Sequence, residues 1–474
     1  MNSIFYFLIF FVLTGCTVGP NYNNKKNNSL PVRYDINSLQ LTQKKKVTSN
    51  QFSLNDPVLK WLLKKAICNN FDIKVSLAKI RESRAQFNIS KSKHFPSLDA
   101  NVAVTRDRLS ENSPVIVSFP SGSVPFSYTD YNIGFNASWE IDLFGHNRRT
   151  VEEAKARFQS VVENKCNVGI SVAAEVARLY TQYRLYQNRI KVTQDIINSY
   201  DEIVRLTELK SKQGLNTAID LKKIKSQSLK ENTKLPALKS DLYATLASIS
   251  ILVGEIPKNL LVELDKTSKI PQVNTKYIFV GLPSDLLKLR PDIKIAEREL
   301  AAATASVGVA VSNQYPRFDL LGFAGFDTVV PGTYFNKASS YWLLGPKFSA
   351  PIFRAGSLKN AVKIQQAKCD AAFANYKKTI LHAFADVEVN LISYQNNKII
   401  KRKLFDSYKN LNTAYKLVNK KYKVGQASLV DKLNSQINSK KAYDEYMQSL
   451  AKETTSLILL YKSLGGNITN NADR

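Results

Sequence analysis

The chain has 474 residues, 44% of them hydrophobic, and a net charge of +28, so it is long enough for two or three ordinary domains. Its lysines are scattered through the predicted helices and no aromatic-basic motif interrupts them, so we expect no nucleic-acid partner. The four cysteines, at positions 16, 68, 166 and 369, have neither the spacing of a zinc site nor that of a disulfide framework. We expect no metal and no bound cofactor.

No catalytic constellation is evident in the sequence. The three histidines, His94, His146 and His382, are widely separated, and the chain has no metalloprotease, nucleophile-elbow, Walker or dinucleotide-binding motif. We therefore expect no enzymatic activity and no ATP site.

The N-terminal residues resemble a bacterial lipoprotein signal. Residues 4–13 are apolar but too few to span a bilayer, and they end in Leu13-Thr14-Gly15-Cys16, which is similar to a lipobox. We predict a signal peptide over residues 1–15, acyl chains on Cys16 that anchor the protein to a membrane, and a lipidated polar arm over residues 16–55. Thr17 rather than aspartate follows the cysteine, which favours the outer membrane. An ordinary signal peptide with an incidental cysteine is the alternative.

The first half of the chain begins with a predicted helix over about residues 56–92. After Pro96, apolar and polar side chains alternate to about residue 105, which is typical of a strand. Residues 107–130 are rich in Ser, Pro and Gly and are predicted to form a long loop.

A second strand is predicted over residues 131–142, where the alternation has no fault. A side-chain period of two gives a strand one apolar and one polar face. The apolar face, with Tyr131, Phe135 and Trp139, suits a lipid environment, and the opposite face of Asn, Ser, Glu and Asp side chains suits a water-filled lumen.

From residue 147 the spacing of apolar residues changes to the alternating three and four of a coiled-coil seam. The next 66 residues contain no proline and one glycine, and as a helix they would be about 100 Å long. Gly214 is predicted to end this helix and Asn216 to cap a returning helix. The returning helix would end at Gly254, with a tolerated interruption at Pro236.

The second half repeats this plan. After a connecting segment over residues 255–282, the pattern predicts a helix, two strands, a long helix of 68 residues without glycine or proline, and a final helix that ends at Gly465. Gly134, Gly214, Asp220 and Gly254 each have an identical counterpart 211 positions later. We predict two repeats, over residues 56–254 and 283–465, and a tail over residues 466–474.

These elements favour a channel. One chain supplies four strands, which cannot close a barrel, and open sheet edges are not tolerated in lipid. Three chains would supply twelve strands, an even number suited to a transmembrane barrel. The predicted fold is mainly α with a small β part: tandem helix–strand–strand–helix–helix repeats that form a trimeric 12-stranded β-barrel continuous with a long α-helical barrel, which the resemblance described below implies to be periplasmic. A soluble sandwich would show the same alternation, but it does not account for helices of about 100 Å attached to the strands.

Several motifs resemble the TolC-like outer-membrane efflux proteins, in particular their NodT-type lipoproteins. The similar segments are Gly15-Cys16-Thr17-Val18-Gly19-Pro20-Asn21-Tyr22, Ser138-Trp139-Glu140-Ile141-Asp142-Leu143-Phe144-Gly145, Leu235-Pro236-Ala237-Leu238, Leu282-Pro283-Ser284-Asp285-Leu286-Leu287, Arg290-Pro291-Asp292 and Ala296-Glu297. The resemblance covers residues 15 to about 465. It implies a homotrimer in the bacterial outer membrane that docks a periplasmic adaptor protein and an inner-membrane RND-type pump and exports drugs or other small molecules.

The resemblance also implies a periplasmic gate, at which the helix–turn–helix tips close the pore. The segment from Tyr422 to the turn at Gly425, with Asp431, matches the inner tip of the family, and Gly214 with Asp220 matches the outer tip. Three copies of Asp431 would make an acidic ring that favours cations. The alternative is that Asp431 only caps its helix or faces solvent.

Two positions depart from the family's pattern. Ala427 stands where the family can have a basic partner, and Asn434 stands where it can have a second ring carboxylate. We therefore expect the closed state to depend more on packing and on hydrogen bonding by Tyr422 than on ion pairs. The hypothesis is that Asp431→Ala increases leak through the closed pore.

Two other functions are compatible with parts of the sequence. A type I protein-secretion duct would have the same architecture, although the lipobox and the segment around Arg290 resemble the drug-efflux group better. A secreted coiled-coil scaffold or adhesin, whose strands form a soluble cap, would need no detergent and would lack a lipid-facing band.

Overall fold

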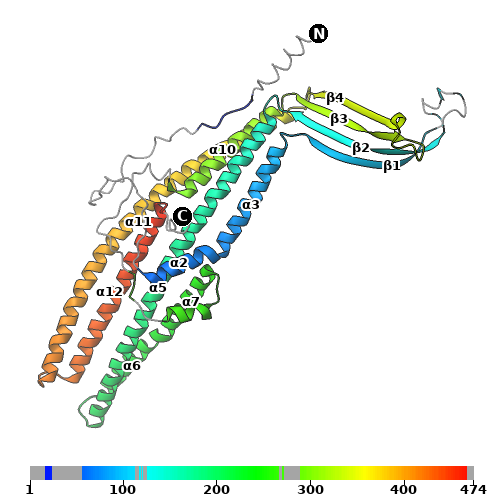
Figure 1. Cartoon of the computed structure of the whole chain (residues 1–474). Helices are drawn as coiled ribbons and strands as arrows, with labels where there is room; N and C mark the ends of the chain where they lie inside the picture. The colour runs from blue at the N-terminus through cyan, green and yellow to red at the C-terminus, as the bar shows by residue number, and fades with distance from the viewer. Residues whose placement is uncertain are drawn as a thin grey trace. The chain divides into compact units, whose positions relative to one another are not determined.

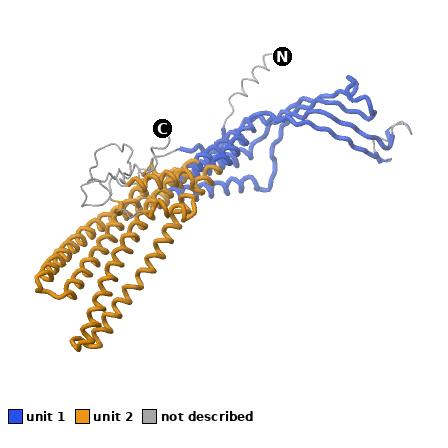
Figure 2. The backbone as a smooth tube through the Cα atoms, turned by 60° about the horizontal axis from the view of Figure 1, so that its bottom comes forward, with its two compact units in different colours: residues 1–26, 80–161, 296–376 blue, residues 27–79, 162–295, 377–474 orange. Residues whose placement is uncertain are grey.

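The computed structural model describes residues 17–23, 56–110, 112, 117–118, 120, 125–265, 269–271 and 289–466. The chain divides into two compact units, each built from several segments (Figure 2). Unit 1 contains residues 1–26, 80–161 and 296–376, and unit 2 contains residues 27–79, 162–295 and 377–474. Both halves of the sequence therefore contribute to each unit.

The described residues form helices and one small sheet, which confirms the predicted mainly α fold with a small β part (Figure 1). The helices are α2 (Pro57–Asn69), α3 (Phe71–Ser92), α5 (His146–Lys212), α6 (Ala218–Asn232), α7 (Lys234–Val253), α8 (Pro257–Leu264), α10 (Pro291–Ser312), α11 (Ser357–Lys423) and α12 (Leu429–Ser463). The strands are β1 (Ser97–Arg108), β2 (Ser127–Ile141), β3 (Arg317–Thr328) and β4 (Ser340–Ser349), with a 3-10 turn, η2 (Lys337–Ser339), before β4. The order α3-β1-β2-α5 recurs as α10-β3-β4-α11.

Three helix predictions for the first half were wrong. The predicted helix over residues 56–92 breaks at Asn70, whose side-chain Oδ1 accepts a hydrogen bond from Ile73 N at 3.1 Å and so competes with the helical backbone pattern. Thr217, not Asn216, caps the returning helix.

The third error concerns the interruption of the returning helix, which occurs at Thr233, between α6 and α7, and not at Pro236. Pro236 is the third residue of α7. The first turn of a helix has no intrahelical acceptor for its N–H groups, so a proline there costs nothing in hydrogen bonding.

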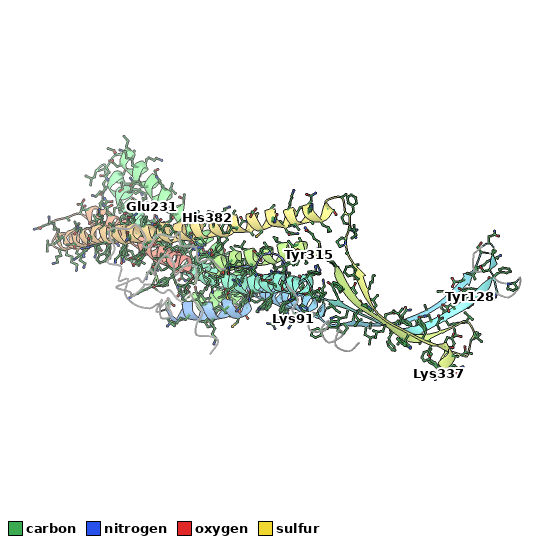
Figure 3. All side chains as sticks on the ribbon, turned by 90° about the horizontal axis from the view of Figure 1, so that it is seen from above. Lys91, Tyr128, Glu231, Tyr315, Lys337 and His382 are labelled. Carbon is green, nitrogen blue, oxygen red and sulfur yellow. The ribbon has the colours of Figure 1, made fainter. Side chains whose placement is uncertain are left out.

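The sheet of unit 1 is antiparallel in the order β1-β2-β3-β4. Directly paired residues point to the same face of a sheet. One register row contains Ala100, Phe135, Ala324 and Trp342, and the rows on either side of it on this face are also mainly apolar. The neighbouring rows on the opposite face carry most of the Asn, Asp and Ser side chains. Figure 3 shows side chains on both faces.

The polar face also carries an aromatic pair. The Phe323 ring stacks on the Tyr341 ring with centroids 4.5 Å apart. Asn132 Nδ2 donates to Tyr341 Oη at 2.8 Å. A side chain at Gly134 would collide with the Phe323 ring, because an added Cβ would lie 2.6 Å from its edge. The glycine therefore makes room for an aromatic ring on this face.

Unit 2 is a packed helical body. Its largest core cluster joins α2, the middle of α5, α7 and α8 through fully buried side chains such as Leu62, Tyr180, Ile249 and Leu260. A second cluster joins α5 to the first turns of α12 through Ile203, Leu433 and others. In the part of the chain that the structure describes, no single helix is long and apolar enough to cross a membrane, and the bent pair Ala218–Val253 with Pro257–Leu264 meets that test by length and composition only.

Candidate functional site

The predicted tip turns are two similar helix–turn–helix connections in unit 2. After α5, Gly214 has φ +72° and Leu215 N donates to Lys210 O at 2.9 Å. After α11, Gly425 has φ +77° and Gln426 N donates to Lys421 O at 2.8 Å. A residue in the left-handed region with this backward hydrogen bond is the usual glycine termination of a helix.

Each turn is followed by a capping box. Ser428 caps α12: its Oγ accepts from Asp431 N at 3.1 Å, while the Asp431 carboxylate accepts from Ser428 N and Oγ at 3.1 and 2.6 Å. Thr217 and Asp220 make the same exchange at the start of α6. Each aspartate thus satisfies backbone groups that the first helical turn leaves unpaired.

In a single chain, Asp431 therefore acts as a capping residue. Hydrogen bonding by Ser428 lowers the pKa of the Asp431 carboxyl, with a smaller contribution from Lys210, so the carboxylate stays ionised. The side chain is also exposed. Asp220 and Asp431 are each bound to their own cap, and no described interaction joins the two side chains.

Tyr422 has a neighbour that the sequence analysis did not identify. Lys432 Nζ lies 4.9 Å from the centroid of the Tyr422 ring, in cation–π contact. Ala427 cannot supply a positive charge, but Lys432 places one beside the tyrosine. Asn434 is exposed two residues further along α12. The contact depends on how the turn at Gly425 folds back, so residue spacing alone gave no signal for it.

The predicted lipid-facing residues lie on the apolar face of β2. Phe135 and Trp139 are 56% and 38% exposed in one chain. Trp139 also donates its Nε1–H to His94 O at 3.0 Å. Tyr131 is partly covered, because the Tyr334 ring meets it edge-on with centroids 5.3 Å apart.

Cys16 lies outside the described residues, but the segment that follows it is described and belongs to unit 1. Arg149, in the first turn of α5, is buried and holds this segment. Its guanidinium donates to Val18 O, Gly19 O and Asn21 Oδ1 at 3.1, 3.2 and 2.7 Å. Glu152 pairs with the same guanidinium at 2.7 Å.

The same segment makes close backbone and ring contacts. Gly19 has φ +88°, and an added Cβ there would lie 2.6 Å from Gly308 Cα in α10. Tyr22 Oη donates to Glu297 at 3.1 Å, and burial together with Glu297 raises the pKa of the Tyr22 hydroxyl. The residues of the sequence motif shared with the lipoproteins thus have a packing role.

Two side chains in unit 2 attach the residue before a helix, α3 or α10, to the end of a returning helix, α7 or α12. In the first half, Asn70 Nδ2 donates to Leu252 O at 2.9 Å. In the second half, Arg290 Nη1 donates to Ser463 O at 2.9 Å. We refer to these two interactions as the Asn70 clasp and the Arg290 clasp.

The Arg290 clasp has more partners. Arg290 pairs with Asp292 and Asp386 at 2.6 and 3.2 Å, and it borders a cavity of about 390 Å³. Burial opposes the charged form, but the two carboxylates outweigh it and raise the pKa of the guanidinium. The Arg-Pro-Asp motif of the sequence therefore has a structural role.

The comparisons with known proteins agree with this arrangement. The profile of the family described as outer membrane efflux protein matches residues 62–255 and 282–466. The antibiotic efflux pump outer membrane protein ArpC of Pseudomonas putida is 28% identical over 96% of this chain and 93% of its own length.

Two further matches cover most of the chain. Nodulation protein T of Rhizobium leguminosarum bv. trifolii is 26% identical over 90% of this chain and 89% of its own. The solved structure of the outer-membrane channel OprN is 26% identical, with a TM-score of 0.82 over 96% of this chain and all of that one. The chain belongs to the outer membrane efflux protein family, and it functions in efflux at the bacterial outer membrane.

Proposed function

We propose that three copies of this chain form a passive duct of a tripartite efflux system, which takes small toxic molecules from a periplasmic adaptor protein and an inner-membrane RND-type pump to the exterior. The duct has no enzymatic activity of its own. Relatives named for the efflux of antibiotics and toluene support small apolar compounds as the exported class.

The sheet is the observation that carries this proposal. Its first and last strands, β1 and β4, each have one neighbour in the chain, so each presents an unpaired edge. One face is a nearly continuous apolar surface, on which Val102 of β1 and Trp342 of β4 are 70% and 77% exposed. Neither open edges nor irregular backbone can face lipid, so neighbouring copies must pair with β1 and β4. Three copies give twelve strands, an even number that suits a closed transmembrane sheet.

The helices of unit 2 support association of copies as well. Leu381, Ile392 and Ile399 of α11 are 66%, 47% and 55% exposed in one chain. They are eleven and seven residues apart, which places them on one side of the helix. A neighbouring copy would remove this apolar stripe from water.

The N-terminal segment supports a lipid anchor on Cys16. Thr17, the next residue, lies against Gly145, where an added Cβ would be 2.8 Å from the threonine methyl group. Gly145 follows β2 by four residues. Acyl chains on Cys16 would therefore start close to the end of the sheet and enter the same membrane.

We also propose that Tyr422, Asp431 and Asn434 of the inner tip, together with Asp220 of the outer tip, form the periplasmic gate. The exposed and ionised Asp431 carboxylate supports an acidic ring in the trimer, although its hydrogen bonds make it a cap as well. A test must therefore separate the charge of this side chain from its capping role.

Single-channel conductance of the detergent-purified protein in planar bilayers makes that separation. We expect small, cation-selective steps that become larger and less selective in Asp431→Ala. Ser428→Ala removes the cap partner but keeps the carboxylate, so it should keep the cation selectivity. Thr217→Ala is the matched control, because it removes the equivalent cap partner of the outer tip and keeps the Asp220 carboxylate.

The outcomes distinguish the alternatives. Equal steps in Asp431→Ala and the wild type would keep the duct and exclude the acidic ring. A protein that stays soluble without detergent and gives no steps would exclude the duct and favour a scaffold.

A further inference from the structure

The two tips of unit 2 carry more positive charge per residue than the chain as a whole. Residues 209–223 contain four lysines and one aspartate, and residues 416–432 contain five lysines and one aspartate. These 32 residues hold a net charge of +7, a quarter of the +28 of the whole chain. We call them the basic tips.

Most lysines of the basic tips are exposed and form no salt bridge within the described chain. Eight of the nine are exposed and form no salt bridge with another described residue: Lys210, Lys212, Lys222, Lys223, Lys416, Lys420, Lys421 and Lys423. Further from the turns, Lys225 pairs with Glu208 and Lys440 pairs with Asp195 at 2.6 Å, whereas the exposed Lys230 and Lys409 form no salt bridge with a described residue.

Helix stability accounts for only part of this set. Lysines in the last turns of α5 and α11 interact favourably with the negative end of the helix dipole. Lys222 and Lys223 lie near the start of α6, and Lys432 lies near the start of α12, where the dipole favours anions instead. The two aspartates of the tips are already engaged in the capping boxes.

Apolar side chains lie among these charges. Leu215 and Val424, which flank the two turns, are 69% and 70% exposed. Added Cβ atoms at Gly214 and Gly425 would meet no other described atom within 4 Å, so the turns are open. An apolar centre with a charged rim is the usual anatomy of a protein–protein interface, and it is not what a lipid headgroup or another polyanion requires.

We propose that the basic tips bind an acidic surface of a partner protein, on which Asp and Glu side chains surround an apolar centre. This inference rests on the proposed function, in which the tips lie in the periplasm, away from the outer membrane. Opposite charges on the two surfaces accelerate association and exclude partners of like charge.

The test uses the full-length trimer and a fluorescent two-helix peptide, in which three glutamates surround a leucine at the turn. The matched probe has three lysines at the same positions. The tip variant is Lys212→Glu with Lys222→Glu and Lys423→Glu. The control variant, Lys359→Glu with Lys363→Glu and Lys368→Glu, makes the same change in net charge at exposed residues of α11 in unit 1.

We expect the glutamate probe to bind the wild type and the control variant, and to bind less tightly as salt is raised from about 50 to 300 mM. Binding to the tip variant should be weaker by about tenfold or more. The lysine probe should not bind.

Four results would overturn the proposal: no binding of the glutamate probe, equal binding of both probes, an unaffected tip variant, or an equal loss in the control variant. Vesicles that contain phosphatidylglycerol test the lipid alternative. If the tip variant binds these vesicles less than the wild type does but binds the glutamate probe equally well, the tips are assigned to a membrane surface. The conductance of the tip variant is measured in parallel. Conduction without probe binding would refute the partner and leave the duct, whereas failure of the wild type to conduct would refute the duct itself.

Discussion

The Asn70 clasp and the Arg290 clasp perform the same task with different chemistry. Asn70 and Arg290 are 220 residues apart, and their acceptors, Leu252 O and Ser463 O, are 211 residues apart. The second spacing is that of the sequence repeat, and the first also separates Pro96 and Pro316, which precede β1 and β3. The first clasp is a neutral amide, and the second is a guanidinium with two carboxylates. A backbone position can thus be kept through duplication while the side chain that serves it changes.

The glycines beside the clasps are identical in the two halves of the sequence. Gly254 and Gly465 have φ +73° and +69°. An added Cβ would lie 2.9 Å from Asn69 O in the first half and 2.9 Å from Leu289 O in the second. The close approach of a neighbouring carbonyl therefore requires glycine at both positions, whereas the clasping side chain differs between the two halves.

The largest effect is expected from Arg290→Ala. The substitution removes hydrogen bonds to Ser463 O and to two carboxylates, and we expect a loss of about 3 kcal/mol in stability. Asn70→Ala is the control and should cost about 1–2 kcal/mol, since it removes a neutral donor and a cap. Thermal loss of helical circular dichroism in the detergent-solubilised protein measures both. Equal losses would show that the additional charge of the second clasp contributes nothing.

A similar contrast is expected at the starts of the two long helices. Arg149 binds the N-terminal segment, whereas Asn360, 211 residues later, has no such segment to hold among the described residues. Arg149→Ala leaves the carbonyls of Val18 and Gly19 without their donor, so we expect a loss of about 2 kcal/mol. Asn360→Ala should change stability by less than about 0.5 kcal/mol. Comparable melting temperatures for the two variants would contradict the clamping role of Arg149.

Substitution of the glycines separates backbone strain from close contact. Gly254→Ala and Gly465→Ala should each cost about 1–2 kcal/mol from the left-handed φ alone, and more because of the nearby carbonyls. Gly214→Ala and Gly425→Ala share the positive φ but have open space, so they report the backbone cost without the contact. If all four variants have the same melting temperature, the close approach at the clasps contributes nothing to stability.

The smallest effect is expected from the capping boxes at low pH. Hydrogen bonds from Ser428 and Thr217 lower the pKa values of Asp431 and Asp220 below that of an unfolded aspartate. Their contribution is present above about pH 4 and is lost as the pH falls through the folded-state values. Amide exchange at the two tips, corrected for intrinsic rates, should be faster at pH 3 than at pH 6. Asp431→Asn should abolish this difference at the inner tip only, and its persistence there would exclude the carboxylate as the cause.

Much of the fold could be predicted because it rests on periodicity. The uninterrupted 3–4 spacing and the lack of proline located α5 and α11 to within a residue, and the alternation of β2 located its apolar face. The break at Asn70 could not be predicted in the same way. A single side-chain hydrogen bond decides it, and an asparagine inside a helical pattern is common.

The candidate site was harder to predict than the fold. Gly214, Gly425 and the two aspartates have recognisable local signatures because turns and caps are local structures. The contact between Lys432 and Tyr422 depends on the path of the turn, and the Arg149 contacts join residues about 130 positions apart. No pattern within one element reports such pairs.

The two clasps also imply an order in which the chain folds while it is being exported to the periplasm. A chain that enters the periplasm from its N-terminus delivers Asn70 and Leu252 before Arg290 and Ser463. The first clasp can therefore close while the second half is still in transit, and the second must wait for the end of α12. The two repeats therefore fold in a defined order, the first clasp before the second.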